Sequence, residues 1–148
     1  MASRIYNAAL AAIMNGTIDL NNSDLRVALV MTNTTADTVN DAIVYVGDIG
    51  TLDECDSSGY ARLPLADESV AVVDGSDLAK FDATDLVFTG LGGDATRQIQ
   101  GAVIYKHVSS DADSPVLAYI DFTAPLATTA VSVTLPWDAA GILTMAQA

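Results

Sequence analysis

Positive charge is scarce in this chain of 148 residues. Six Lys and Arg stand against 19 Asp and Glu, which gives a formal net charge of −13. Proteins that bind nucleic acids neutralise phosphates with clustered Lys and Arg. The basic residues here are instead scattered along the chain: Arg4, Arg26, Arg62, Lys80, Arg97 and Lys106. We therefore expect no direct binding to nucleic acid and a preference for basic partner surfaces.

Histidine and cysteine are also scarce, which excludes several kinds of site. The single histidine, His107, rules out a site with two histidine ligands, and the single Cys55 rules out an intramolecular disulfide. The acidic neighbours of Cys55 disfavour a reactive thiolate. No G-x-S-x-G motif occurs and no glycine precedes a lysine, so the nucleophile elbow and the P-loop are missing. We predict that the protein is not an enzyme and has no catalytic, cofactor-binding or metal-binding residues and no cofactor.

A glycine-rich segment and three acidic clusters each allow both a structural and a ligand-binding interpretation. Gly90–Ala95 fits G-x-G-x-x-A, but a strand-like sequence follows it where a dinucleotide site needs a helix, so we interpret it as a loop. Paired carboxylates can bind calcium or act as acid and base on glycosides. We interpret the acidic clusters as solvated turns and keep calcium binding, as in a carbohydrate-binding module, as an alternative. The clusters are Asp53/Glu54/Asp56, Asp74/Asp77 with Asp82/Asp85, and Asp111/Asp113.

Apolar residues, in contrast, are abundant for a single small domain. Hydrophobic residues make up 51% and charged residues 17%, against about 25% charged in an average soluble domain. No uncharged apolar run approaches the roughly 18 residues that a membrane span requires, and the first residues do not resemble a signal peptide. We expect no membrane contact and a surface that binds other proteins. For Trp137, we weigh a rim position at the end of the fold against an exposed anchor in a subunit contact.

The order of patterns predicts a mainly β fold in a single domain, 1–148, with one N-terminal helix. Ser3 as N-cap, helical spacing of apolar residues and Gly16 predict a helix over residues 4–15. A second short helix over 38–46, capped by Asp37 and ended by Gly47, is favoured narrowly. The rest predicts a sandwich or barrel-like core over residues 25–145. Its expected strands are 25–31, 60–65 with Pro64 at an edge or bulge, 70–73, 86–88, 99–107, 116–122, 131–135 and 142–145.

A series of short motifs runs through the chain in a fixed order. It begins with Ile5–Leu10, Gly16–Leu20 and Leu25–Val30, and continues with Glu54 shortly before Gly59–Arg62, Phe81–Phe88, Arg97 before Gly101–Lys106, Leu117–Phe122 and Gly141–Leu143. In this order the motifs resemble a family of small structural proteins in the virions of tailed bacteriophages.

The resemblance covers nearly the whole chain and implies a non-enzymatic, β-sandwich-like virion component. It implies a capsid decoration (cement) protein that stabilises the mature shell, with a tail or fibre-attachment subunit as the alternative. The implied partners are the major capsid protein or other virion proteins, and the implied location is the virion, assembled in the host cytoplasm. The apolar composition and the resemblance together favour a homo-oligomer, with a trimer preferred.

Overall fold

The computed structural model describes residues 3–38, 42–129 and 131–146. The fold is mainly β and sandwich-like, since its antiparallel sheets remain separate and do not close into a barrel. In chain order the elements are β1 (Arg4–Ile5), α1 (Asn7–Met14), β2 (Leu25–Met31), a 3-10 turn (Val46–Asp48), β3 (Leu63–Pro64), β4 (Ser69–Val73), a 3-10 turn (Asp74–Ser76), β5 (Leu78–Asp82), β6 (Leu86–Phe88), β7 (Ile99–Lys106), β8 (Val116–Leu126), β9 (Val133–Leu135) and β10 (Leu143–Ala146).

The core of the molecule is a five-stranded sheet with the order β1-β8-β7-β2-β3. Its central strands are buried over consecutive residues, not alternate ones, so both faces of the sheet are covered. Val27 pairs with Ile104 on β7, and Ile104 pairs with Ala118 on β8. Pro64 lies in the edge strand β3, where its missing N–H costs no ladder bond, so its predicted edge position is confirmed.

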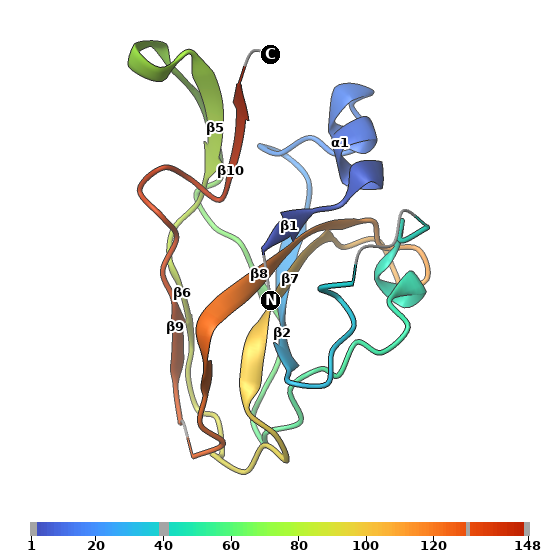
Figure 1. The fold of residues 1–148 in the computed structure, drawn as a ribbon, viewed down its shortest axis with the longest axis vertical. Coiled ribbons are helices and arrows are strands. Elements are labelled where there is room, and N and C mark those ends of the chain that lie inside the picture. Colours follow the sequence, from blue (N-terminus) through green and yellow to red (C-terminus); the bar gives the residue numbers. More distant parts are fainter. Residues whose placement is uncertain (1–2, 39–41, 130, 147–148) are drawn as a thin grey trace.

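Two smaller sheets extend along one side of the core. β6 pairs with β9, and the order of the third sheet is β10-β5-β4. We call β4, β5 and β10 the projecting sheet, because it stands with α1 at one end of the long axis of the molecule (Figure 1). The chain passes from β5 to β6 and returns from β9 to β10, so the two small sheets follow one another end to end.

The N-terminal helix is shorter than predicted, because its expected first residues belong to a strand. Arg4 and Ile5 pair with Tyr119 and Ala118 on β8, and the Ser3 hydroxyl accepts a bond from the backbone N–H of Asp121. Ser3 is therefore not the N-cap, and the helix begins only at Asn7. Its predicted end is confirmed, since Gly16 takes a positive φ of 78° just after the C-cap.

The second predicted helix, over 38–46, is wrong where the chain is described; residues 39–41 lie outside the described ranges. Val46 N–H donates to the Ser114 carbonyl, and Val116 N–H donates to the Val44 carbonyl. The Asp48 carboxylate accepts from the backbone N–H groups of Val44 and Tyr45. These bonds hold the backbone extended alongside the β7–β8 connection, so only a single 3-10 turn forms afterwards.

Candidate functional site

The projecting sheet has one face made entirely of apolar side chains. The register aligns Val70, Phe81 and Leu143 in one row across the three strands, and Val72, Ala79 and Met145 in the next. Side chains two residues apart on a strand point to the same face, so both rows lie on one side. The sequence predicted a strand here, but not that its apolar face is left open.

The first row is buried at Phe81 and Leu143 but exposed at Val70 on β4, and the second row is exposed at Val72 and Met145. Phe81 and Leu143 are 2% and 5% exposed, whereas Val72 is 76% exposed and Met145 is 36% exposed. A groove of about 350 Å³ runs between this face and the segment around α1, lined there by Ile13, Ile18 and Leu20. The groove therefore begins at the core and opens onto the exposed second row.

The apolar face ends at acidic residues. A second hollow at the tip of the projecting sheet, of about 530 Å³, is lined by Val72, Ala79 and Met145 together with Asp74 and Asp77. Asp19 lines the groove itself, together with Lys80, whose charge is paired with Asp82. Hydrogen bonds from the Asn22 side chain and the Asn21 backbone hold the pKa of the Asp19 carboxyl below its ordinary value, so its negative charge persists at neutral pH.

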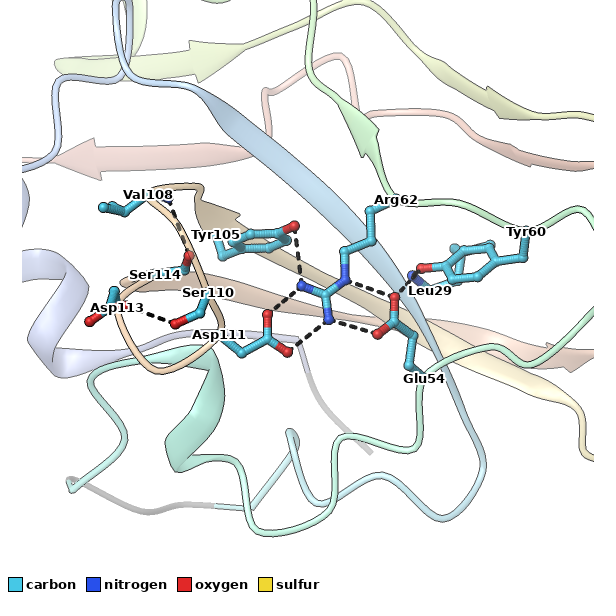
Figure 2. A network of polar contacts seen from close by, with 10 residues as sticks. All are labelled: Leu29, Glu54, Tyr60, Arg62, Tyr105, Val108, Ser110, Asp111, Asp113 and Ser114. Carbon is cyan, nitrogen blue, oxygen red and sulfur yellow. Dashed lines mark hydrogen bonds and ion pairs between the residues drawn. The ribbon is translucent and has the colours of Figure 1, made fainter.

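A polar site, separate from the apolar face, joins distant segments around Arg62, just before β3. The Arg62 guanidinium binds Glu54 through Nε–Oε1 (2.8 Å) and Nη2–Oε2 (2.7 Å). It binds Asp111 in the β7–β8 connection through Nη1–Oδ1 (2.5 Å) and Nη2–Oδ2 (2.9 Å). A fifth bond runs from Nη1 to the Tyr105 hydroxyl at 3.3 Å. Figure 2 shows Arg62 between the two carboxylates, with Tyr60 on the far side of Glu54.

This arrangement is a structural connection and offers no ligand site. A guanidinium has five N–H donors, and all five of Arg62 are used within the chain. The Tyr60 hydroxyl donates to Glu54 and accepts from the Leu29 N–H on β2, which attaches the cluster to the central sheet. We call Arg62, Glu54, Asp111, Tyr60 and Tyr105 the Arg62 cluster.

The ionisation of the cluster follows from these contacts. The hydrogen bonds that Arg62 donates to Glu54 and Asp111 raise the pKa of Arg62 further above its ordinary value. The same contact with Arg62 holds the pKa of the Asp111 carboxyl below its ordinary value. Burial, assisted by the nearby Glu54, raises the pKa of Tyr60, so its hydroxyl keeps the proton that it donates. The cluster is therefore charged and fully bonded at neutral pH.

The acidic clusters of the sequence separate in the structure onto different partners. Asp53 pairs with Arg97 and Asp56 accepts from Thr96, while Glu54 turns to Arg62. Glu54 and Asp111 both bind Arg62, although Asp111 lies 49 residues after Arg62 in the sequence. Asp82 pairs with Lys80, Asp85 accepts from the Trp137 N–H, and Asp113 accepts from Ser109 and Ser110. Within the described ranges, no three or more His, Cys, Asp or Glu side chains are placed to hold a metal ion.

The remaining candidate residues have structural positions. Cys55 is buried, and burial, with a smaller effect of Asp56 and Glu54, raises the pKa of its thiol. His107 is half-buried just after β7, with its ring edge-on to Tyr105. The Trp137 indole is half-buried against the core and donates to the Thr84 carbonyl at 3.0 Å, which is the geometry of a rim residue. The Gly90–Ala95 segment is a loop followed by β7, as predicted.

Nearly all positive charge is engaged inside the chain. Among the described residues, four basic side chains form ion pairs, with partners in parentheses: Arg26 (Asp24), Arg62 (Glu54 and Asp111), Lys80 (Asp82) and Arg97 (Asp53). Lys106 donates to the Thr17 carbonyl at 2.7 Å. Arg4 lies on the β10 side of the projecting sheet, across from β4. The apolar face is thus bordered at β4 by acidic residues alone.

Comparisons with known proteins do not place the chain in a family. No protein-family model, curated protein or solved structure matches it. Within the described residues, no helix is long and apolar enough to cross a membrane. The candidate functional site is therefore defined by geometry alone, as the apolar face of the projecting sheet with its groove and acidic border.

Proposed function

We propose that this chain is a non-enzymatic structural protein of a tailed-bacteriophage virion, and specifically a capsid decoration protein that binds the mature shell. The proposal rests on the ordered motifs of the sequence and on one structural observation that carries it. That observation is the apolar face of the projecting sheet, left open beside the groove.

A contiguous exposed apolar face is unusual in a protein that works alone. Single exposed apolar residues are common, but an apolar patch bordered by polar residues is typical of contact sites. Here Val70, Val72 and Met145 form such a patch on strands that are held in place by the buried Phe81 and Leu143. The polar groups of the Arg62 cluster, in contrast, are used within the chain. The available binding surface is therefore apolar with an acidic border, which suits another protein.

A decoration protein acts through linkage between binding and assembly. Because it binds the assembled shell and not the dissociated subunits, its binding free energy adds to the stability of the particle. The border of the site is acidic, so the contacts pair apolar side chains with basic residues of the shell. Such border charges make association faster at low salt. The partner is then the major capsid protein, and a homo-oligomer, preferably a trimer, would present several copies of the projecting sheet at once.

Particles assembled without the protein test this function. We expect them to package DNA but to lose it at lower temperature or after milder osmotic shock than complete particles. Adding back the purified protein should restore the resistance. If the depleted particles were equally robust but failed to join tails or to adsorb to cells, the decoration function would be wrong and a tail or fibre-attachment function would replace it.

A further inference from the structure

The edge of β4 is open to a further strand. Within the described residues β4 pairs with β5 alone, so its other edge has no neighbouring strand. Proteins usually protect such edges with charged side chains, proline, bulges or very short strands. The edge strands β1 and β3 are two residues long, and β3 carries Pro64. β4 is five residues long, contains neither a charged residue nor a proline, and is paired without a bulge.

The two ends of this open edge have the same sign of charge. Asp67 and Glu68 precede β4, and Asp74 and Asp77 follow it. Asp67, Asp74 and Asp77 are exposed, and the nearest basic residue, Lys80 on β5, is held by Asp82 and the Ala139 carbonyl. A strand that binds here meets apolar side chains along its middle and carboxylates at both ends.

We propose that the open edge of β4 takes an extended segment of the shell protein, apolar at alternate positions and flanked by Lys or Arg, which adds to the projecting sheet as a fourth strand. This inference rests on the proposed function and names the partner of its site. Backbone hydrogen bonds to β4 provide affinity, as in other cases of strand addition. Alternate side chains extend the apolar rows that end at Val70 and Val72, and the basic flanks face the four carboxylates.

A second copy of this chain fits the same edge poorly. An antiparallel dimer centred on Ala71 would set Glu68 of each copy opposite Asp74 of the other, and like charges directly opposite are destabilising. A dimer centred on Val72 would set Asp67 of each copy opposite Asp77 of the other. The charge of the border therefore favours a basic partner over a second copy of this chain.

Two synthetic peptides provide a direct probe. Both alternate Val and Thr over seven residues; one carries two Lys at each end and the other two Glu. Fluorescence anisotropy with the full chain should show at least tenfold tighter binding of the Lys-flanked peptide at low salt. Asp74→Asn with Asp77→Asn should weaken this binding by about two- to fivefold for each carboxylate removed, and high salt should remove the difference.

Val72→Asp should abolish binding of the Lys-flanked peptide, because it places a charge in the apolar row of β4 against which the added strand packs. Val72 is 76% exposed, so the variant should keep the wild-type melting temperature. Val87→Asp is the matched control, since Val87 is an exposed valine on β6, away from the projecting sheet, and should bind like wild type. Equal binding of the two peptides, or unchanged binding by Val72→Asp, would overturn the inference.

Depleted particles separate this inference from the proposed function. If wild type and Val72→Asp protect particles equally, decoration stands and the β4 site is wrong. If the Lys-flanked peptide binds at β4 but neither wild type nor any variant protects particles, β4 does bind a basic strand but the shell protein is not its partner. That result would overturn the proposal as stated. A wild-type dimer in sedimentation that Val72→Asp dissociates would also overturn it, since the occupant would be a second copy.

Discussion

The five-stranded sheet and the projecting sheet are built from similar residues but are used differently. In β2, β7 and β8 the valines are buried on both faces, and Arg62 joins the surrounding segments through five hydrogen bonds. In the projecting sheet Phe81 and Leu143 are buried, whereas Val70, Val72 and Met145 are exposed. The first sheet therefore holds the fold together, while the second leaves apolar side chains exposed.

Glycine substitutions give the largest expected contrast between the two sheets. A Cβ at Gly101 on β7 would clash with the Ile120 carbonyl oxygen and lie 2.9 Å from the Tyr119 ring, whereas a Cβ at Gly75, at the tip of the projecting sheet, would have nothing within 4 Å. We expect Gly101→Ala to lower the free energy of unfolding by about 3 kcal/mol and Gly75→Ala to change it by less than about 0.5 kcal/mol. Urea denaturation measures both, and equal effects would show that the two sheets are packed alike.

Removing an ion pair from each region gives a smaller contrast. Arg62→Ala leaves Glu54 and Asp111 without their shared partner in a partly buried position. We expect a loss of about 2 kcal/mol, between the values for exposed and fully buried pairs. Lys80→Ala removes the single Lys80–Asp82 pair of the projecting sheet and should cost less than about 1 kcal/mol. Urea denaturation compares the two variants. A larger loss of unfolding free energy for Lys80→Ala would show that the projecting sheet, and not the Arg62 cluster, contributes more to holding the fold together.

Acid should weaken the Arg62 cluster in a defined direction. The folded pKa of Asp111 is lowered by Arg62, so its contribution to stability is present above its unfolded pKa of about 4 and is lost as the pH falls through the folded value. Wild type should therefore lose stability between pH 5 and pH 3. Asp111→Asn should lose less, by under about 1 kcal/mol, because the Asp111 side chain is 42% exposed. Identical pH dependence of the two proteins would show that this ion pair has no role.

Calcium should have the smallest effect of all. Most acidic side chains of the predicted clusters accept hydrogen bonds or form ion pairs within the chain, as Asp53, Asp56 and Asp113 do, and no three are placed to hold a metal ion within the described residues. EDTA or added calcium should therefore leave the melting temperature unchanged. A site that bound calcium in the native state alone would add about 2.7 kcal/mol at a hundredfold excess over its dissociation constant. A rise of several degrees would favour the carbohydrate-binding alternative.

Local patterns predicted the strands well because each carries its own signal. The uninterrupted apolar run of β2 and the edge position of Pro64 follow from side-chain type alone. β5 was missed because Lys80 and Asp82 interrupt its apolar pattern. The helix over 38–46 was wrong because its backbone bonds to the distant Ser114–Val116 segment, and tertiary contacts of this kind override local propensity.

The candidate site could be predicted only in part. The Val-rich β4 between two pairs of acidic residues is visible in the sequence, and its lack of polar alternation is a signal for the exposed apolar side chains that the structure shows there. Which face is covered depends on the register with β5 and β10, which the sequence does not specify. The pairing of Glu54 and Asp111 on Arg62 likewise depends on the approach of segments far apart in the chain.

Amide hydrogen exchange measures directly whether the projecting sheet binds the particle through β4. In the free protein the outward-facing amides among Ser69–Val73 should exchange quickly, while those in the central strand β7 should be strongly protected. Binding to depleted particles should slow exchange at β4 and leave β7 unchanged. If the protein bound the particles while exchange at β4 stayed fast, the particle would be bound through another surface, and the projecting sheet would have no role in binding.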